Sequence, residues 1–434
     1  MSMRRRALLA QMNDADVVGL QVDFENNTFN RLAGARGRRP GMDFDCFAPF
    51  GGRRRCCVAD DGRINAFYGE AGYAEDGAAG QVMVYQPAFF YRTEPLKVTP
   101  NADGTGGHLK KVNYYVSASP KPGFKRHPLF YKETGEAADY VLLSAYEASY
   151  YDASLGRIFS DGADTDTTVD YSLDRLCSLA GQKPVSGLKK KLTRANAEAL
   201  AAARGAGWHI DTIKALAATQ MLMLVEYGAM NMQNAIGQGV VSLPDLSGAN
   251  CAVLTGSTAS LGNATGTAEE SVRECNGTLT PYRENGKTAV SYRGAENPWG
   301  NMWNLVNGAH LWGDGTFGAG MVYICRNTSF AYSENTADYE PTGLILPNGN
   351  GYAASIGYSE PFDWLFVPSR NGGTASLPVG DYSYAAADLN GYRILRLGGD
   401  WEWTQFAGMF AGRYVDEDTL SARSAGFRLL YLPA

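Results

Sequence analysis

The sequence predicts an α+β fold with a small β-rich unit at its N-terminus. Three observations predict it. Apolar segments typical of strands fill the first third of the chain, two capped helical segments lie between residues 193 and 228, and the remainder is rich in turns. Helices placed between a strand-rich and a loop-rich region form an α+β pattern.

Residues 1–78 are predicted to be a separate unit. Residues 17–24 alternate between apolar and other residues, which indicates a strand. Asn26-Asn27, Gly51-Gly52 and residues 60–62 mark turns, and few helical periods are present. We expect this unit to serve attachment or oligomerisation and residues 79–434 to form one ligand-binding domain.

Three further strands are predicted before residue 150. They cover residues 81–91, 111–116 and 140–146. Pro87 lies inside the first of them and cannot donate a ladder hydrogen bond, so we expect that segment at a sheet edge or a bulge.

Two helices are predicted next. Thr193 is a good N-cap for residues 194–204, and Gly205 and Gly207 stop that helix. Asp211 is predicted to cap the second helix, and Gly228 ends it. The second helix has apolar residues at helical spacing: Ile213, Leu216, Ala217, Leu224 and Tyr227. Residues 237–434 show no convincing long helix.

The bulk composition excludes several classes of function. The chain has 434 residues, 45% of them hydrophobic, and a net charge of −6, which argues against general binding of nucleic acid. The 25 Tyr and 51 Gly are typical of loop-rich proteins and of recognition surfaces. We expect no signal peptide and no membrane insertion, because the apolar runs are too short for either.

No metal or disulfide site is predicted. The seven Cys are odd in number and form no C-x-x-C pair, so we expect most thiols to be reduced and buried. The four His, at positions 108, 127, 209 and 310, are scattered. Asp416-Glu417-Asp418 could hold Ca²⁺ through oxygen ligands, although a solvated loop is the simpler interpretation. We expect no other cofactor.

Three ordered motifs in the last third of the chain are the most specific signal. They are the segment 292–303, with the letters YRGAENPWGNMW, then Arg396-Leu-Gly-Gly-Asp-Trp401, and Ala425-Gly-Phe-Arg428. In order and spacing they resemble the C-type-lectin-like fold of the formylglycine-generating-enzyme (sulfatase-modifying factor) type. The resemblance covers residues 80–434, weakly before Thr193 and strongly after Arg293.

The resemblance implies structural roles for the motif residues. The tryptophans at 299, 303 and 401 would pack the core, because large aromatic rings give the most burial per residue. Gly398 and Gly399 would permit a tight turn. Gly426 and Phe427 would belong to the closing motif, and Arg428 would be a buried hydrogen-bonding strut.

The chain departs from the family's enzymes. The oxidase members carry two copper-binding Cys between the second and third motifs, whereas the window from Glu402 to Ala425 has none. Four scattered His do not supply an iron site either. We therefore expect no catalytic residues and a binding protein, not an enzyme. The alternatives are an enzyme with a relocated metal site and a bacterial surface adhesin.

The same window is the predicted ligand-binding surface. Its expected ligand-binding residues are Asp400, Glu402, Trp403, Gln405, Phe406, Met409, Arg413, Tyr414 and Asp416. We expect them to be exposed together, with Trp403 and Phe406 as hot spots.

The arrangement resembles receptor-binding proteins of phage tails and the variable proteins of diversity-generating retroelements. The resemblance implies host recognition through a protein or carbohydrate receptor on a cell surface. We also expect a homo-oligomer, most simply a trimer, because the N-terminal unit is small and rich in Arg and a unit of this size has a marginal core on its own. The expected location is the virion or the cytoplasm of the producing cell.

Overall fold

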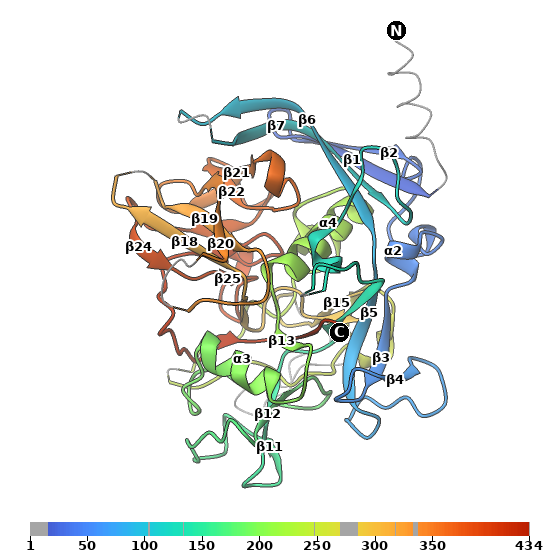
Figure 1. Ribbon diagram of the computed structural model, residues 1–434, viewed down its shortest axis with the longest axis vertical. Coiled ribbons are helices and arrows are strands. Elements are labelled where there is room, and N and C mark those ends of the chain that lie inside the picture. The colour runs from blue at the N-terminus through green and yellow to red at the C-terminus, as the bar shows by residue number, and fades with distance from the viewer. Residues whose placement is uncertain are drawn as a thin grey trace.

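In the computed structural model, residues 16–102, 105–132, 134–246, 248–269, 285–316, 318–332 and 337–433 are described. The longest helix, α4 (Ile213–Tyr227), lies at the centre of the molecule (Figure 1). Thirteen of its fifteen residues are buried, as expected of a core helix that is apolar on all sides. The Thr212 hydroxyl caps its start by accepting from the Ala215 N–H, and Gly228 ends it in the left-handed conformation. The predicted capping residue, Asp211, was wrong by one position.

The other helices are shorter. They are α2 (Ala48–Gly51), α3 (Arg194–Ala202) and α5 (Met232–Ala235). Thr193 caps α3 as predicted, through a hydrogen bond from the Asn196 N–H. Single 3₁₀ turns occur at Met42–Phe44, Pro128–Phe130, Ala259–Leu261, Glu360–Phe362 and Thr404–Phe406.

The largest sheet has twelve strands. Its main path runs in the order β2 (Thr28–Ala33), β1 (Val17–Asp23), β7 (Gly107–Ser117), β21 (Gly351–Tyr358), β23 (Tyr382–Tyr384), β26 (Gly412–Arg413), β25 (Arg396–Leu397), β17 (Trp303–Leu305) and β27 (Ala425–Gly426). Beside this path, β22 (Pro368–Asn371) pairs with β21, β6 (Phe90–Pro100) pairs with β7, and β8 (Lys125–Arg126) pairs with β6.

A second sheet has six strands. Their order is β13 (Trp208–Ile210), β28 (Leu429–Tyr431), β9 (Tyr140–Ser144), β5 (Gln81–Pro87), β3 (Arg54–Val58) and β4 (Ile64–Phe67). β5 is an interior strand, and the predicted edge position for Pro87 was wrong. Pro87 is tolerated because it is the last residue of the strand, opposite Tyr140.

Three small sheets complete the fold. One contains β11 (Arg157–Phe159), β10 (Ser149–Asp152) and β12 (Arg175–Cys177), and another contains β14 (Gly266–Thr267), β15 (Val290–Tyr292) and β16 (Ala295–Glu296). The four-stranded sheet contains β20 (Tyr339–Ile345), β19 (Met321–Cys325), β18 (Ala309–Asp314) and β24 (Asn390–Arg393).

The predicted fold class was wrong. The described residues form 28 strands in several sheets and only four α-helices, and 12% of the described residues are helical when the 3₁₀ turns are included. The protein is therefore mostly β and not a two-helix α+β lectin-like fold. Several strands have only two or three residues, such as β25 and β27. Strands this short carry no alternating pattern that a sequence window can detect.

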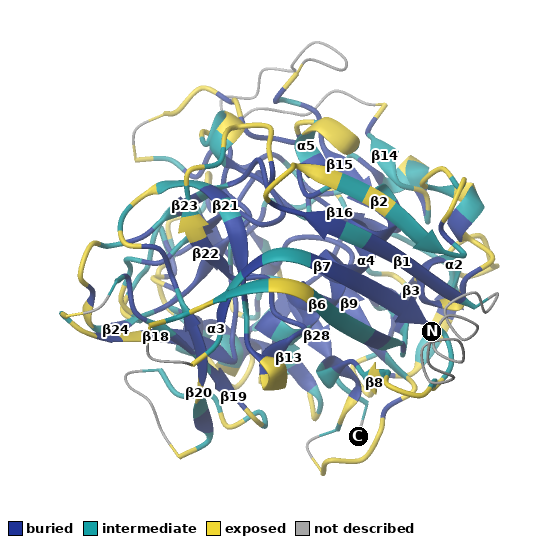
Figure 2. Ribbon diagram, turned by 90° about the horizontal axis from the view of Figure 1, so that it is seen from above, coloured by how far each residue is buried: buried dark blue, intermediate teal, exposed yellow. Residues whose placement is uncertain are grey.

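The boundary predicted at residue 78 does not separate two cores. β1 pairs with β7 along its whole length, and β3 pairs with β5. Val18 and Leu20 belong to the same buried apolar cluster as α4 and Trp299. Figure 2 shows β1, β3 and β7 in the dark blue of buried residues. The N-terminal strands are therefore part of the main sheets.

Candidate binding surface

The aromatic residues of the three C-terminal motifs lie in the protein core. Trp299, Trp303, Trp401 and Phe427 are at most 1% exposed, which confirms their predicted burial. The Trp299 indole N–H donates to the Gln238 carbonyl at 3.0 Å. In the tight turn after β25, a side chain at Gly399 would collide with Ala407, so the turn requires glycine there.

Arg428 ties three segments together. Its guanidinium donates to the carbonyls of Glu296 at 2.8 Å, Ala145 at 3.2 Å, and Ser144 and Asn297 at 3.3 Å. Its side chain is half-buried in the structure. Its contacts agree with the predicted hydrogen-bonding strut, whereas its predicted burial is only partial.

The strand register of the largest sheet places a row of aromatic and basic side chains on one face. Tyr352 in β21 pairs with Tyr382 in β23, and Tyr384 in β23 pairs with Arg413 in β26. Arg413 in turn pairs with Arg396 in β25. Directly paired residues, and residues two apart in one strand, share a face of a sheet. These five side chains therefore lie on the same side.

The segment after Trp401 completes this face. The Trp403 ring packs edge-on against Trp303, with 4.4 Å between ring centroids. The Phe406 ring lies 4.8 Å from Tyr382 and 5.8 Å from Tyr352. We call the partly exposed set Tyr352, Tyr382, Tyr384, Trp403, Phe406 and Arg413 the aromatic face.

Ion pairs fix the basic side of the aromatic face. The Asp416 carboxylate accepts a hydrogen bond from Arg413 at 3.0 Å and forms an ion pair with Arg396, at an N–O distance of 3.1 Å. The Arg413 guanidinium lies over the Tyr384 ring at 4.5 Å, and that of Arg396 lies over Trp303 at 5.2 Å. Such stacking holds a guanidinium flat and leaves its edge free for further hydrogen bonds.

A buried carboxyl group supports the strand that carries the two tyrosines. Asp381 precedes β23 and is 1% exposed, and its carboxylate accepts from the Phe410 N–H at 2.7 Å. Burial raises the pKa of Asp381 well above its usual value. The contact joins β23 to the segment that continues into β26.

The nine predicted ligand-binding residues fall into three groups. Glu402 and Gln405 are exposed, and Trp403, Phe406, Arg413 and Asp416 are half-buried on or beside the aromatic face. Asp400, Met409 and Tyr414 are 2–4% exposed, so the expected exposure was wrong for these three. Burial raises the pKa of Asp400 to about 6. The segment between the two buried motifs is not exposed throughout, because these three side chains pack into the core.

The predicted ligand-binding residues do not include the three tyrosines of the aromatic face. The loops 348–360 and 381–392, which contain them, were only the alternative place for the surface if Trp403 and Phe406 belonged to the core. Tyr352 lies 50 residues, Tyr382 20 residues and Tyr384 18 residues before Glu402, where the predicted window begins. Their only sequence signal is the Tyr-Ser-Tyr alternation in β23, where Ser383 between them is buried. Alternation over three residues indicates a shared face but not which strands lie next to it.

Two carboxylates of the acidic run 416–418 form ion pairs with arginines. Asp416 pairs with Arg396 and Arg413, and Asp418 accepts from the buried Arg194 at 3.0 Å. Among the described residues, no group of three or more His, Cys, Asp or Glu is placed to hold a metal ion. Ca²⁺ binding by this run stays a prediction.

The histidines lie apart from one another. His127 and His310 are fully buried among aromatic rings, and burial lowers the pKa of each to about 3. His209 contacts Glu198 at 2.6 Å, and His108 lies in β7. Of the cysteines within the described ranges, Cys46 is exposed and the others are buried, and all are free thiols. Cys275 lies outside the described residues.

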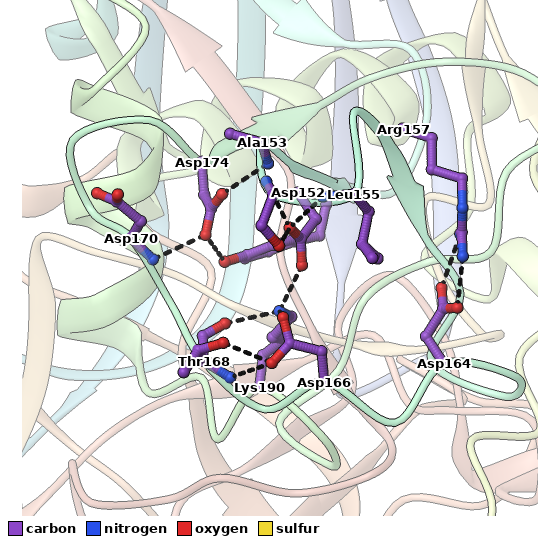
Figure 3. A network of polar contacts seen from close by, with 12 residues as sticks. Asp152, Ala153, Leu155, Arg157, Asp164, Asp166, Thr168, Asp170, Asp174 and Lys190 are labelled. Atoms are coloured by element: carbon purple, nitrogen blue, oxygen red, sulfur yellow. Dashed lines mark hydrogen bonds and ion pairs between the residues drawn. The ribbon is translucent and has the colours of Figure 1, made fainter.

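A second cluster of carboxylates surrounds one lysine. Lys190 has a fully buried side chain and contacts Asp152 at 2.7 Å, Asp166 at 3.4 Å and the Thr168 carbonyl at 2.6 Å (Figure 3). Its ammonium also lies near the rings of Tyr150 and Phe159. The ammonium thus occupies the place that a cation would take, so the cluster is a structural ion pair network.

None of the described helices is both long enough and apolar enough to span a membrane.

No family model matches the sequence, and no curated protein matches it. Among solved structures, the chain is similar to the P3c, U1 and I1 variants of Major Tropism Determinant. Each is 13% identical, and each alignment covers 87% of this chain and 71% of the other, with a TM-score of 0.28. A TM-score this low does not establish a common fold.

Proposed function

We propose that the protein is a receptor-binding protein of a phage tail, or one derived from a phage, and that the aromatic face is its ligand-binding surface. The observation that carries this proposal is the aromatic face itself. Five aromatic side chains and one arginine from four separate segments converge on one side of a sheet and remain partly exposed.

The chemistry of the aromatic face suits recognition better than catalysis. Tyr and Trp offer large rigid surfaces at a low cost in conformational entropy, and arginine adds directed hydrogen bonds. Flat rings of this kind pack against sugar rings and against apolar protein side chains alike. The proposed ligand is therefore a protein or carbohydrate receptor on a cell surface, bound without chemical change.

The rigid support of the aromatic face agrees with this role. Four of its members lie in strands, and Trp403 rests on the buried Trp303. A preorganised surface loses little entropy when it binds. The phage setting is proposed from the sequence motifs described above, with the virion as the location of the mature protein.

Substitutions on the aromatic face test this proposal. Tyr384→Ala truncates a partly exposed ring of the aromatic face, and Gln405→Ala truncates an exposed side chain next to Phe406 of that face. The double variant combines both substitutions, and its binding to intact bacterial cells and to purified surface polysaccharide is measured. We expect the double variant to lose about tenfold or more in affinity, since truncating a central aromatic residue commonly costs about 2 kcal/mol. The thermal midpoint should stay within a few degrees.

Tyr171→Ala is the matched control. Tyr171 is 43% exposed and lies outside the aromatic face. Its variant should bind as the unmodified protein does. If control and double variant lose binding equally, or neither loses any, the aromatic face is not the binding surface.

We also propose that the protein is a homo-oligomer, with a trimer as the simplest case and residues 1–78 contributing contacts. Within the described residues, β2 and β4 are edge strands of the two largest sheets, and both belong to this region. Edge strands offer unpaired backbone groups to a neighbouring chain. Light scattering that finds a monomer at micromolar concentration would reject this part of the proposal.

A further inference from the structure

A cavity lies outside the aromatic face. It is a cavity of about 290 Å³ at the start of α4, bordered by the Pro128–Phe130 turn, the end of β19 and residues near the end of the chain. None of its lining residues belongs to the aromatic face. A volume near 300 Å³ is the lower end of the range for small-molecule sites.

One side of this cavity is apolar. Leu129 is buried, Tyr131 is exposed at the rim, and Phe330 and Leu432 are half-buried. The His209 ring packs edge-on against the Phe330 ring, with 5.9 Å between ring centroids. A flat apolar group would replace water against these side chains, which is the main source of affinity in such sites.

The lining also carries positive charge. Lys132, Lys214 and Arg326 line the cavity, and none of the lining residues that the structure describes is Asp or Glu. The Lys214 ammonium donates to the Arg326 carbonyl at 3.0 Å. Lys214 lies in the first turn of α4, where the helix dipole adds further positive potential.

The surroundings of Lys214 favour a bound anion. Burial lowers the pKa of Lys214, and the charges of Cys325 and Glu340 act in the opposite direction. A carboxylate in the cavity would compensate the desolvated ammonium and form a charge-assisted hydrogen bond.

We propose that this cavity binds a small monoanionic ligand with a flat apolar body, of the class of aromatic carboxylates. The carboxylate contacts Lys214, and the ring lies against Phe330 and Leu129. The site is independent of the aromatic face and does not rest on the proposed receptor binding.

Titration calorimetry with 2-naphthoate and its neutral isostere 2-naphthamide tests the site in the full chain. The two probes share one shape and differ in charge. We expect saturable binding of 2-naphthoate and at least about tenfold weaker binding of 2-naphthamide, because a hydrogen bond to a charged group contributes more than a neutral one.

The variant Lys214→Met should reduce the affinity for 2-naphthoate about tenfold and leave 2-naphthamide unchanged. Lys189→Met, at a lysine outside the cavity, should change neither. Arg326→Gln removes a second lining charge at an exposed position. If Lys214→Met does not fold, the affinities of Arg326→Gln for 2-naphthoate and 2-naphthamide are compared instead. Absence of saturable binding, or equal binding of 2-naphthoate by the charge-removing and control variants, would overturn the proposal.

Discussion

Buried carboxyl groups near the motif residues are costly at neutral pH. Glu147 is 5% exposed and accepts a hydrogen bond from the Asn301 side chain. Burial raises the pKa of Glu147 from its ordinary value of 4.5 to about 8, although the nearby Arg428 acts in the opposite direction. The folded state therefore holds this proton more tightly than the unfolded chain does.

The sign of the resulting pH dependence follows from this shift. Between about pH 4.5 and 8 the unfolded chain loses the proton while the folded protein keeps it. The stabilisation from Glu147 is therefore complete below pH 4.5 and is lost as the pH rises through 8. The loss has an upper bound of about 1.4 kcal/mol for each pH unit in this window.

We predict that Glu147→Gln removes this dependence, because an amide resembles the protonated carboxyl group at every pH. The free energy of unfolding of the variant, relative to the unmodified protein, should increase from pH 5 to pH 8 in urea titrations. Asp211 and Asp400, each with a pKa raised to about 6 by burial, act equally in both proteins and cancel in the difference.

Glu402→Gln, at an exposed position, controls for the loss of one negative charge. A difference between Glu147→Gln and the unmodified protein that stays constant from pH 5 to pH 8 would contradict the prediction.

At the scale of single elements, capping and glycine signals predicted the helices well. The segments 194–204 and 213–228 became α3 and α4, because Thr193 and Gly228 act locally and need no tertiary partner. The long strands β1, β7 and β9 were also predicted at their places, since each presents enough residues to show its pattern. The two-residue strands were not predictable.

The candidate site was predictable only in part for the same reason. Trp403, Phe406 and Arg413 follow a recognisable motif and were identified from the sequence. Tyr352 and Tyr382 join them because β21 pairs with β23, a contact between residues 30 positions apart. Pairing of this kind depends on register and topology, which no local pattern records.

At the scale of the whole molecule, the N-terminal strands complete two sheets. β1 lies between β2 and β7, and β3 lies between β4 and β5. The same region supplies polar partners to the interior, since the Gly41 N–H donates to the fully buried Glu226 and Asp45 pairs with Arg293 at 2.8 Å. The stability of residues 79–434 therefore depends on the N-terminal strands.

We predict that a chain of residues 79–434 alone does not fold cooperatively. Without residues 17–67, strands β5 and β7 would each lose a neighbour, and apolar side chains such as Val84 and Val112, which are fully buried, would meet water. Arg293 and Glu226 would keep their mutual ion pair, but Arg293 would lose Asp45 and Glu226 would lose the Gly41 N–H. Hydrogen bonds to charged groups contribute the most, so these losses are costly inside the protein. Near-ultraviolet circular dichroism during thermal unfolding should show no sharp transition for this fragment.

Adding residues 16–78 as a separate peptide should restore a transition, because the lost contacts are noncovalent. This complementation distinguishes missing sheet partners from general damage by truncation. A fragment of residues 79–434 that unfolds cooperatively, with the thermal midpoint of the full chain, would show that the boundary at residue 78 separates independent domains after all. The shared core of Leu20, Trp299 and α4 argues for the opposite result, since removing one layer of a common core exposes the layer beneath it.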